Sequence, residues 1–303
     1  MIEIKRILCP VDFSDYSRRA LEHAVVLARW YDAEITVLHA YGLPVPPVLE
    51  GAYPGPVAWT VITPPLPELR DQIVDQLKSF LDSVRSTGVS LYFEAVGCRA
   101  VPGILTAADT MPADLIVMGT HGRGGLDRLA LGSVTEKVLR KASCAVMTVP
   151  PAVSSAPIGG PVLFERILCP VDFSNSSMNA LAHALSLAQE ADARLSLLHV
   201  VEALPHWDRP TFDVSAYEDA MTTAAYERLQ EAIPDEARAW CTPEVLVTKG
   251  SSYREILRVA RERDAHVIVM GVQGRNAVDL MVFGSTTHHV IREATCPVLT
   301  LRG

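Results

Sequence analysis

The sequence lacks the patterns that mark membrane, secreted and metal-binding proteins. No apolar run approaches the roughly 20 residues that span a bilayer, and the N-terminus has no signal-peptide pattern. None of the six cysteines stands in a Cys-x-x-Cys pair, so the spacing of a zinc site or a thioredoxin-type site is missing. We therefore expect a soluble cytoplasmic protein without a metal site, in which the cysteines are small buried apolar residues.

Clusters of basic residues are also missing. The chain has 27 Lys and Arg against 35 Asp and Glu, a net charge of -8, whereas a nucleic-acid surface needs Lys and Arg gathered together. We expect neither nucleic acid nor a membrane among the partners. An acidic total still permits a phosphate ligand, because backbone N–H groups can bind one.

A duplication organises the 303 residues. The segment Arg6–Ser14, Arg-Ile-Leu-Cys-Pro-Val-Asp-Phe-Ser, recurs unchanged as Arg166–Ser174. A repeat of this length indicates duplicated domains rather than a solenoid. A stretch rich in Pro, Gly and Ser separates the two copies. We predict two nucleotide-binding domains, residues 1–150 and 165–303, with a linker at 151–164.

Each copy alternates strand patterns with helix patterns. Apolar and β-branched runs in the first copy predict strands at 7–11, 34–40, 90–96, 115–118 and 145–149, and helical periodicity predicts helices at 15–31, 66–84, 100–110 and 133–141. Uniformly apolar strands in this alternation favour a parallel sheet covered by helices on both faces. The predicted fold class is α/β, with two tandem doubly wound sheets of five strands each, Rossmann-like in form. Such sheets bind ligands at the carboxyl ends of their strands, where the winding reverses.

Two strand ends in each copy carry unusual residues. The first strand ends in Asp12 and its twin in Asp172, while the fourth strand runs into a loop of glycine, two residues, glycine, nine residues, glycine and serine. That loop occupies 119–133 and again 271–285. Glycine permits positive φ and close approach of N–H groups, and the closing Gly-Ser opens a helix whose N-terminus favours an anion. The pattern indicates a polyphosphate beside a carboxylate that binds ribose or base, and a plain tight connection is the alternative.

With these residues the chain resembles the universal stress protein family in its tandem form, over nearly its whole length. The resemblance rests on Pro10–Ser14 and its copy Pro170–Ser174, on the strand ends Leu38–Ala40 and Leu198–Val200, and on both glycine loops. Nucleotide-binding members of the family share the glycine spacing, so the resemblance implies ATP as cofactor, with or without magnesium. It also implies strand order 3-2-1-4-5 and a pseudo-dimer within the chain through the two fifth strands. A further homodimer is left open.

The resemblance carries a set of nucleotide-binding residues onto both copies. The adenosine end would meet Val11, Asp12, Ala40, Asp172 and Val200, and the ribose and phosphates would meet Gly119, Gly122, Gly132, Ser133, Val134, Gly271, Gly274, Gly284, Ser285 and Thr286. Arg123, which repeats as Arg275, is either a phosphate contact or a solvated cation. Because Asn276-Ala277 replaces two glycines and Leu280 replaces Arg128, we expect the first site to bind more tightly.

Binding is favoured over catalysis. The chain has no Gly-x-x-x-x-Gly-Lys-Ser/Thr motif, and the fourth strands end in Met118 and Met270 with no acidic metal ligand. The expected function is an ATP-binding stress-response regulator that acts on an unidentified protein partner. A slow ATP hydrolase and a nucleotide-free scaffold are the alternatives. The repeated histidines, of which His23 and His39 are the first, are expected to be packed and hydrogen bonded rather than metal ligands.

Overall fold

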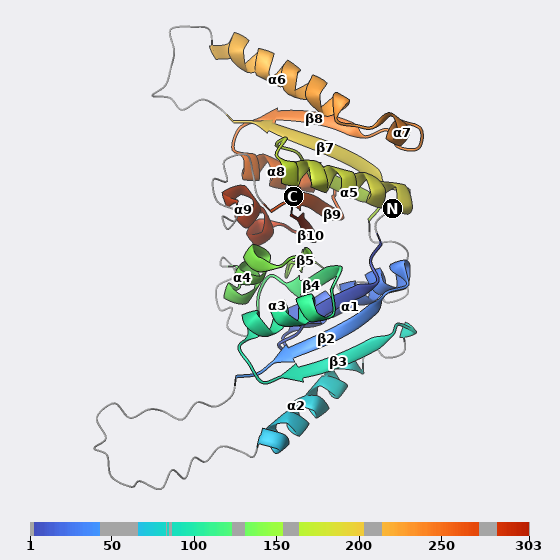
Figure 1. Cartoon of the computed structure of the whole chain (residues 1–303). Coiled ribbons are helices and arrows are strands. Elements are labelled where there is room, and N and C mark those ends of the chain that lie inside the picture. Colours follow the sequence, from blue (N-terminus) through green and yellow to red (C-terminus); the bar gives the residue numbers. More distant parts are fainter. Residues whose placement is uncertain are drawn as a thin grey trace, which may run out of the picture.

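The computed structural model describes residues 3–42, 66–82, 84, 87–122, 131–153, 164–202, 214–272 and 284–302. Below, the first half means the described residues up to 153, and the second half means those from 164 onward. Their strands form one ten-stranded sheet in the order β3-β2-β1-β4-β5-β10-β9-β6-β7-β8 (Figure 1). Most of the predicted linker, residues 154–163, lies outside the described residues.

The two halves repeat one order of elements. The first half contains β1 (Arg6–Pro10), α1 (Asp15–Tyr31), β2 (Glu34–Ala40), α2 (Leu66–Leu81), β3 (Leu91–Val96), α3 (Ala100–Thr110), β4 (Leu115–Gly119), α4 (Ser133–Lys141) and β5 (Ala145–Val149). The second half contains β6 (Arg166–Pro170), α5 (Asn175–Ala191), β7 (Arg194–Val201), α6 (Val214–Glu231), α7 (Asp235–Arg238), β8 (Glu244–Lys249), α8 (Ser252–Glu262), β9 (Val267–Gly271), α9 (Ser285–Glu293) and β10 (Val298–Leu301).

Local signals at the first helix explain where it begins and ends. The hydroxyl of Ser14 accepts a hydrogen bond from the N–H of Ser17, as an N-cap residue does. Asp32 ends the helix in the left-handed conformation, with a φ of 49°. Ser174 and Asp192 bound α5 in the same way. The predicted bounds of this helix, 15–31, are confirmed.

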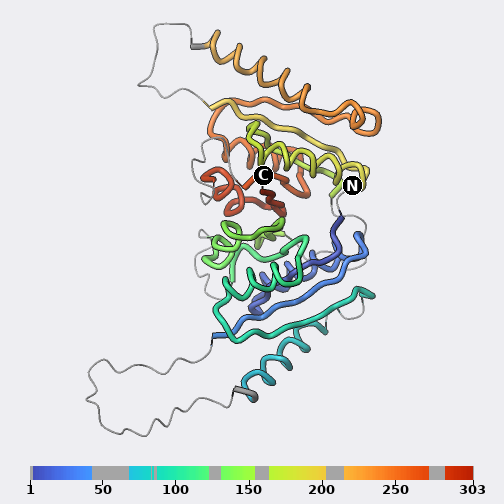
Figure 2. Tube along the Cα trace, viewed as in Figure 1, coloured from blue at the N-terminus to red at the C-terminus, as the bar shows by residue number. Residues whose placement is uncertain are grey.

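Helices cover both faces of the sheet. Alternate residues of each strand point to opposite faces, so in β1 Ile7 joins a core with α1 and α2 while Leu8 joins a core with α3 and α4. The first core continues across both halves, because α5 and α6 pack on the same face as α1 and α2. The tube in Figure 2 shows the two halves arranged with β3 and β8 at opposite ends of the sheet.

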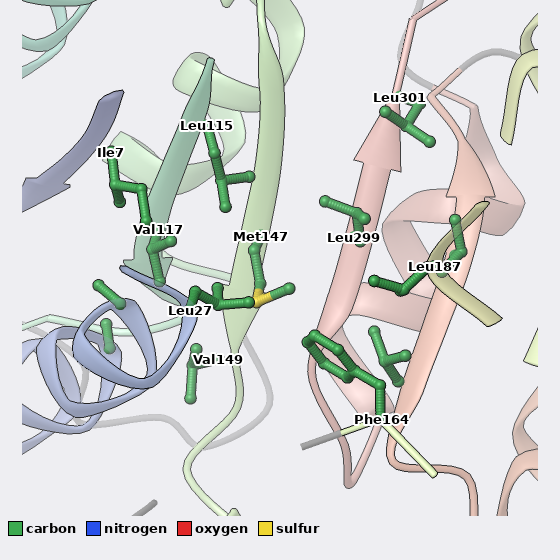
Figure 3. Packing of buried hydrophobic residues seen from close by; sticks show 14 of the residues in the cluster. Ile7, Leu27, Leu115, Val117, Met147, Val149, Phe164, Leu187, Leu299 and Leu301 are labelled. Atoms are coloured by element: carbon green, nitrogen blue, oxygen red, sulfur yellow. The ribbon is translucent and has the colours of Figure 1, made fainter. Parts of the chain in front are cut away.

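The halves join through their fifth strands. β5 and β10 pair antiparallel, and Met147 lies opposite Leu299 on the face that α1 and α5 cover (Figure 3). On the other face two buried hydroxyls donate across the same pair of strands, Thr148 to the carbonyl oxygen of Val298 and Thr300 to that of Val146, at 3.3 and 2.9 Å. The predicted pairing of the fifth strands is therefore confirmed.

The structure changes the prediction in two respects. The order 3-2-1-4-5 holds within each half, but the expected pair of sheets is a single sheet, because antiparallel pairing of β5 and β10 leaves no edge between them. The helix predicted at 66–84 ends at Leu81, since Val84 lies in a turn that is still buried. No helix among the described residues is long and apolar enough to cross a membrane.

Because Met147 and Leu299 are direct partners, truncating both should show coupling. We expect Leu299→Ala to lower the free energy of unfolding by about 2–4 kcal/mol, since the residue is 6% exposed. A double-mutant cycle with Met147→Ala should give a coupling energy of about 0.5–3 kcal/mol in urea denaturation. The control pair is Leu299→Ala with Ile73→Ala on α2, which should add within about 0.5 kcal/mol. If the effects of the Met147 and Leu299 variants simply added, the proposed packing between β5 and β10 would be contradicted.

Candidate functional site

The carboxyl ends of β1 and β4 lie side by side. The two strands pair in parallel, and the same holds for β6 and β9 in the second half. After β1 the chain turns into α1 on one face, and after β4 it turns into α4 on the other. The strand ends that carry the predicted site residues are thus the point at which the winding reverses.

Asp12 and Gly122 are in close contact at this point. A Cβ atom placed on Gly122 would lie 2.6 Å from Oδ2 of Asp12. The first loop and the first strand therefore come together as the sequence predicts. Only a residue without a side chain leaves the Asp12 carboxylate in its present position.

The turn after the strand fixes the direction of this carboxylate. Oδ1 of Asp12 accepts hydrogen bonds from the N–H and the hydroxyl of Ser14, at 3.1 and 2.5 Å. Asp172 accepts the same pair from Ser174, at 3.0 and 2.6 Å. Both carboxylates are held before any ligand arrives, which lowers the ordering cost of binding.

Phe13 and its twin Phe173 adopt a left-handed backbone, each with a φ of 64°. That conformation is strained for a bulky residue, and such strain gathers at functional sites. The ring of Phe13 packs on the ring of His39 with centroids 4.3 Å apart, and Nδ1 of His39 donates to the carbonyl oxygen of Val11 at 2.7 Å. These contacts tie the end of β2 to the end of β1.

The histidines behave as packed, hydrogen-bonded residues. His199 repeats the bond of His39, with Nδ1 2.7 Å from the carbonyl oxygen of Val171. His23 and His183 each bond a backbone carbonyl oxygen one helical turn earlier, and burial lowers the pKa of His23. Within the described ranges, no group of three or more His, Cys, Asp and Glu could hold a metal ion.

Gly119 and Gly271, among the described loop glycines, are closely packed and do not have positive φ, which corrects one expectation. A Cβ on Gly119 would lie 3.2 Å from backbone and side-chain atoms of Tyr16. One on Gly271 would lie 2.8 and 2.9 Å from backbone atoms of Ser176 and Ser177. The described glycines with positive φ are Gly88 and Gly250, outside both loops. The start of α5 packs so closely on the strand end that Gly271 is needed whether or not a ligand binds, while the start of α1 leaves slightly more room at Gly119.

The helices after the loops begin in the same way in both halves. Gly132 and Gly284 are the N-cap residues, and as glycines they supply no side-chain cap to either helix. The N–H of Gly132 donates to the carbonyl oxygen of Thr120 at 2.8 Å, and Thr135 Oγ1 donates to that of Gly119 at 2.9 Å. Thr287 and Gly271 repeat the second bond at 3.0 Å. The helix start is thereby anchored to the strand end, and its first-turn N–H groups are left to other acceptors.

The remaining predicted residues fall at the same edge of the sheet. Ala40 and Val200 are half-buried in β2 and β7, and Val11 is buried directly after β1. Ser133, Val134, Ser285 and Thr286 form the first turns of α4 and α9. Arg123 and Gly274 lie outside the described residues.

Sequence reasoning missed three kinds of residue at the site. They are the left-handed Phe13 and Phe173, the anchoring Thr135 and Thr287, and Gly103, whose added Cβ would lie 2.7 Å from Sγ of Cys98. The threonines follow Gly-Ser at the same distance in both copies. That repetition in the sequence could have identified the two threonines as site residues.

The first site has an aromatic pair that the second lacks. The rings of Tyr16 and His121 lie 5.6 Å apart beside Gly119. In the second half, the position of Tyr16 is taken by Ser176. The two sites therefore share a backbone arrangement but differ in the side chain at this position.

The two packed glycines generate a matched prediction. Gly271→Ala should lower the free energy of unfolding by about 1–3 kcal/mol, because backbone atoms of α5 must move. Gly119→Ala should cost less, since its nearest contacts are at 3.2 Å and need a smaller shift. Urea denaturation of both variants checks this order. Equal costs, or none, would contradict the packing role.

Comparison with known proteins agrees with the fold and the repeat. The model of the universal stress protein family matches residues 3–150 and again 163–302. A universal stress protein of Methanocaldococcus jannaschii is 34% identical over 145 residues, 48% of this chain and 81% of the relative. One of Mycolicibacterium smegmatis is 29% identical over 303 residues, 98% of this chain and 96% of the relative. The crystal structure of a universal stress protein from Archaeoglobus fulgidus covers 98% of each chain at a TM-score of 0.66 and 23% identity, and so agrees in fold.

The two family matches together span nearly the whole sequence and coincide with its two copies. This chain belongs to the universal stress protein family, in its tandem two-domain form.

Proposed function

We propose that each half of the chain binds an adenine nucleotide, ATP with or without magnesium, and that occupancy of the two sites regulates a stress response through a protein partner. The observation that carries the proposal is the close approach of Gly122 to the oriented carboxylate of Asp12, beside a helix start whose N-cap residue is a glycine without a capping side chain. This arrangement offers an acceptor at one end of a crevice and N–H donors at the other.

The charges decide which end of the nucleotide goes where. A carboxylate repels phosphate but accepts hydrogen bonds from ribose hydroxyls or an amino group, so Asp12 and Asp172 suit the adenosine end. The uncapped first turns of α4 and α9 suit the phosphates. The full proposed set is Val11, Asp12, Ala40, Gly119, Gly122, Arg123, Gly132, Ser133 and Val134, with Asp172, Val200, Gly271, Gly274, Gly284, Ser285 and Thr286 in the second half.

A small number of backbone donors is enough to hold a polyphosphate. A hydrogen bond to a charged group contributes about 1.5–3 kcal/mol. Three or four such bonds from backbone N–H groups would hold the phosphates without a lysine. The strained turn at Phe13 also supports ligand binding, because it places Asp12 at the end of β1 at a conformational cost of about 1–3 kcal/mol.

We propose binding without turnover. The chain has no phosphate-binding lysine motif of the P-loop type, and β4 and β9 end in Met-Gly rather than in an acidic residue. A slow hydrolase and a nucleotide-free scaffold are the competing functions. The hydrogen bonds that hold Asp12 and Asp172 also stabilise the turn into each helix, so the choice between a ligand-binding role and the scaffold rests on the nucleotide measurements below.

Isothermal titration with ATP should resolve two sites of unequal affinity, the tighter in the first half. Asp12→Asn retains an oxygen to accept from Ser14 but loses the charge, and should weaken the tighter site about tenfold to a hundredfold. The matched variant Asp172→Asn should weaken the other site alone. Equal loss at both sites from either variant, or no loss from both, would contradict the assignment.

Gly122→Val should abolish binding in the first half, because its Cβ displaces the Asp12 carboxylate. The nucleotide released on denaturing the purified protein, identified by chromatography, measures occupancy directly. The control is Ala224→Val, at an exposed position of α6, with folding checked by circular dichroism. Retention of full occupancy by Gly122→Val, or absence of nucleotide and of any titratable affinity in the unmodified chain, would favour the scaffold.

Phosphate release separates the regulator from the hydrolase. With ATP in excess we expect no sustained release over many equivalents of protein. Steady release at multiple turnovers that disappears in Asp12→Asn and Asp172→Asn would overturn the binding function and support the enzyme.

A further inference from the structure

Among the described residues, the outer strand of the first half is an apolar edge of the sheet with no neighbouring strand on its outer side. β3 is the terminal strand, with sequence Leu-Tyr-Phe-Glu-Ala-Val from residue 91. Tyr92 and Phe93 are 56% and 38% exposed, which is high for large apolar residues in a strand. Figure 1 shows β3 at one end of the sheet, with β8 at the other. An exposed apolar edge is a template for pairing with another strand.

The backbone groups that β3 presents can be identified. The N–H of Ile35 donates to the carbonyl oxygen of Ser90, and the N–H of Tyr41 donates to that of Val96. In a parallel pair, alternate residues bond to the neighbouring strand. Even-numbered residues therefore face β2, and Leu91, Phe93 and Ala95 direct their N–H and C=O groups outward.

The opposite edge of the sheet is guarded by charge. Glu244 at the start of β8 pairs with Arg263 at 2.5 Å, and Lys249 at its end pairs with Glu218 and Asp219. Charged side chains of this kind discourage strand addition. β3 contains one charged residue, Glu94, whose side chain is exposed and whose backbone bonds to β2. The two edge strands therefore differ: β8 disfavours the addition of another strand, and β3 permits it.

We propose that β3 pairs antiparallel with β3 of a second copy of this chain, in a register centred on Phe93. Phe93 then lies opposite its counterpart, and Leu91 lies opposite Ala95, so all three outward-facing residues form hydrogen-bonded pairs. Tyr92 lies opposite Glu94 on the other face, where its hydroxyl can donate to the carboxylate. The strand is self-complementary in this register.

Neighbouring registers are less favourable. Centring on Glu94 sets two carboxylates directly opposite each other, and like charges there destabilise the pair. Centring on Tyr92 leaves Ala95 without a partner in the strand. The pairing repeats between two chains the mode that joins β5 to β10 within one chain.

The expected dimer is weak and depends on protein concentration. A six-residue strand pair with its aromatic side chains buries less area than the roughly 1,200–2,000 Å² of a standard stable interface. Sedimentation velocity over a wide concentration range should show the mass rising from 32.9 kDa toward twice that value. A chain that stays monomeric at every concentration would overturn the proposal.

Two lysine substitutions test the register. Phe93→Lys places two lysines opposite each other and should abolish the dimer, whereas Tyr92→Lys places lysine opposite Glu94 and should retain it. Tyr226→Lys, at a residue 47% exposed on α6, controls for the loss of surface aromatic area and should leave association unchanged. Circular dichroism checks that all three variants are folded. Dimerisation by Phe93→Lys, or loss of it in Tyr92→Lys and Tyr226→Lys alike, would overturn the register.

A disulfide test is independent of charge. In the proposed register residues 92 and 94 of the two copies form non-hydrogen-bonded pairs, with Cα atoms about 4.5 Å apart, which a disulfide can bridge. The double variant Tyr92→Cys, Glu94→Cys should form a reducible dimer under mild oxidation. Each single variant lacks the opposite thiol and should form none above the level of the unmodified chain. Equal cross-linking in a single variant, or none in the double, would contradict the pairing.

Discussion

The parallel pairing of β1 with β4, and of β6 with β9, is the contact on which the rest of each half depends. It brings two strand ends together at the point where the chain leaves toward opposite faces. Close packing then sets the details, because the start of α1 lies on Gly119 and the start of α5 on Gly271. A side chain at Gly271 would push helix and strand apart, and one at Gly119 would require a smaller shift.

Hydrogen bonds fix the orientation of the groups at the site. Ser14 holds the Asp12 carboxylate on one side, and Thr135 ties the start of α4 to the carbonyl oxygen of Gly119 on the other. The carboxylate that accepts hydrogen bonds and the helix start that donates them are thus held in fixed positions by the same backbone. The same bonds recur at Ser174 and Thr287. The backbone arrangement is therefore duplicated, while the side chains around it differ where Ser176 takes the position of Tyr16.

Much of this could be predicted from the sequence, for identifiable reasons. The exact repeat of Arg6–Ser14 revealed the duplication, and the N-cap Ser14 marked the start of α1. Other features could not be predicted. A glycine needed for close packing looks the same in sequence as one needed for positive φ, so the role of Gly119 required the structure. Val84 kept the helical spacing of apolar residues although it sits in a turn, and the four residues of α7 are too short for a periodic signal.

The most direct measurement is a crystal structure of the chain grown with excess ATP. Our account predicts density for the nucleotide at the ends of β1 and β4, with adenosine next to Asp12 and the phosphates at the first turn of α4. It also predicts that the backbone frame is unchanged, because the packing that makes it is complete beforehand. A structure in which protein side chains fill both crevices, with no nucleotide density at either, would contradict the account.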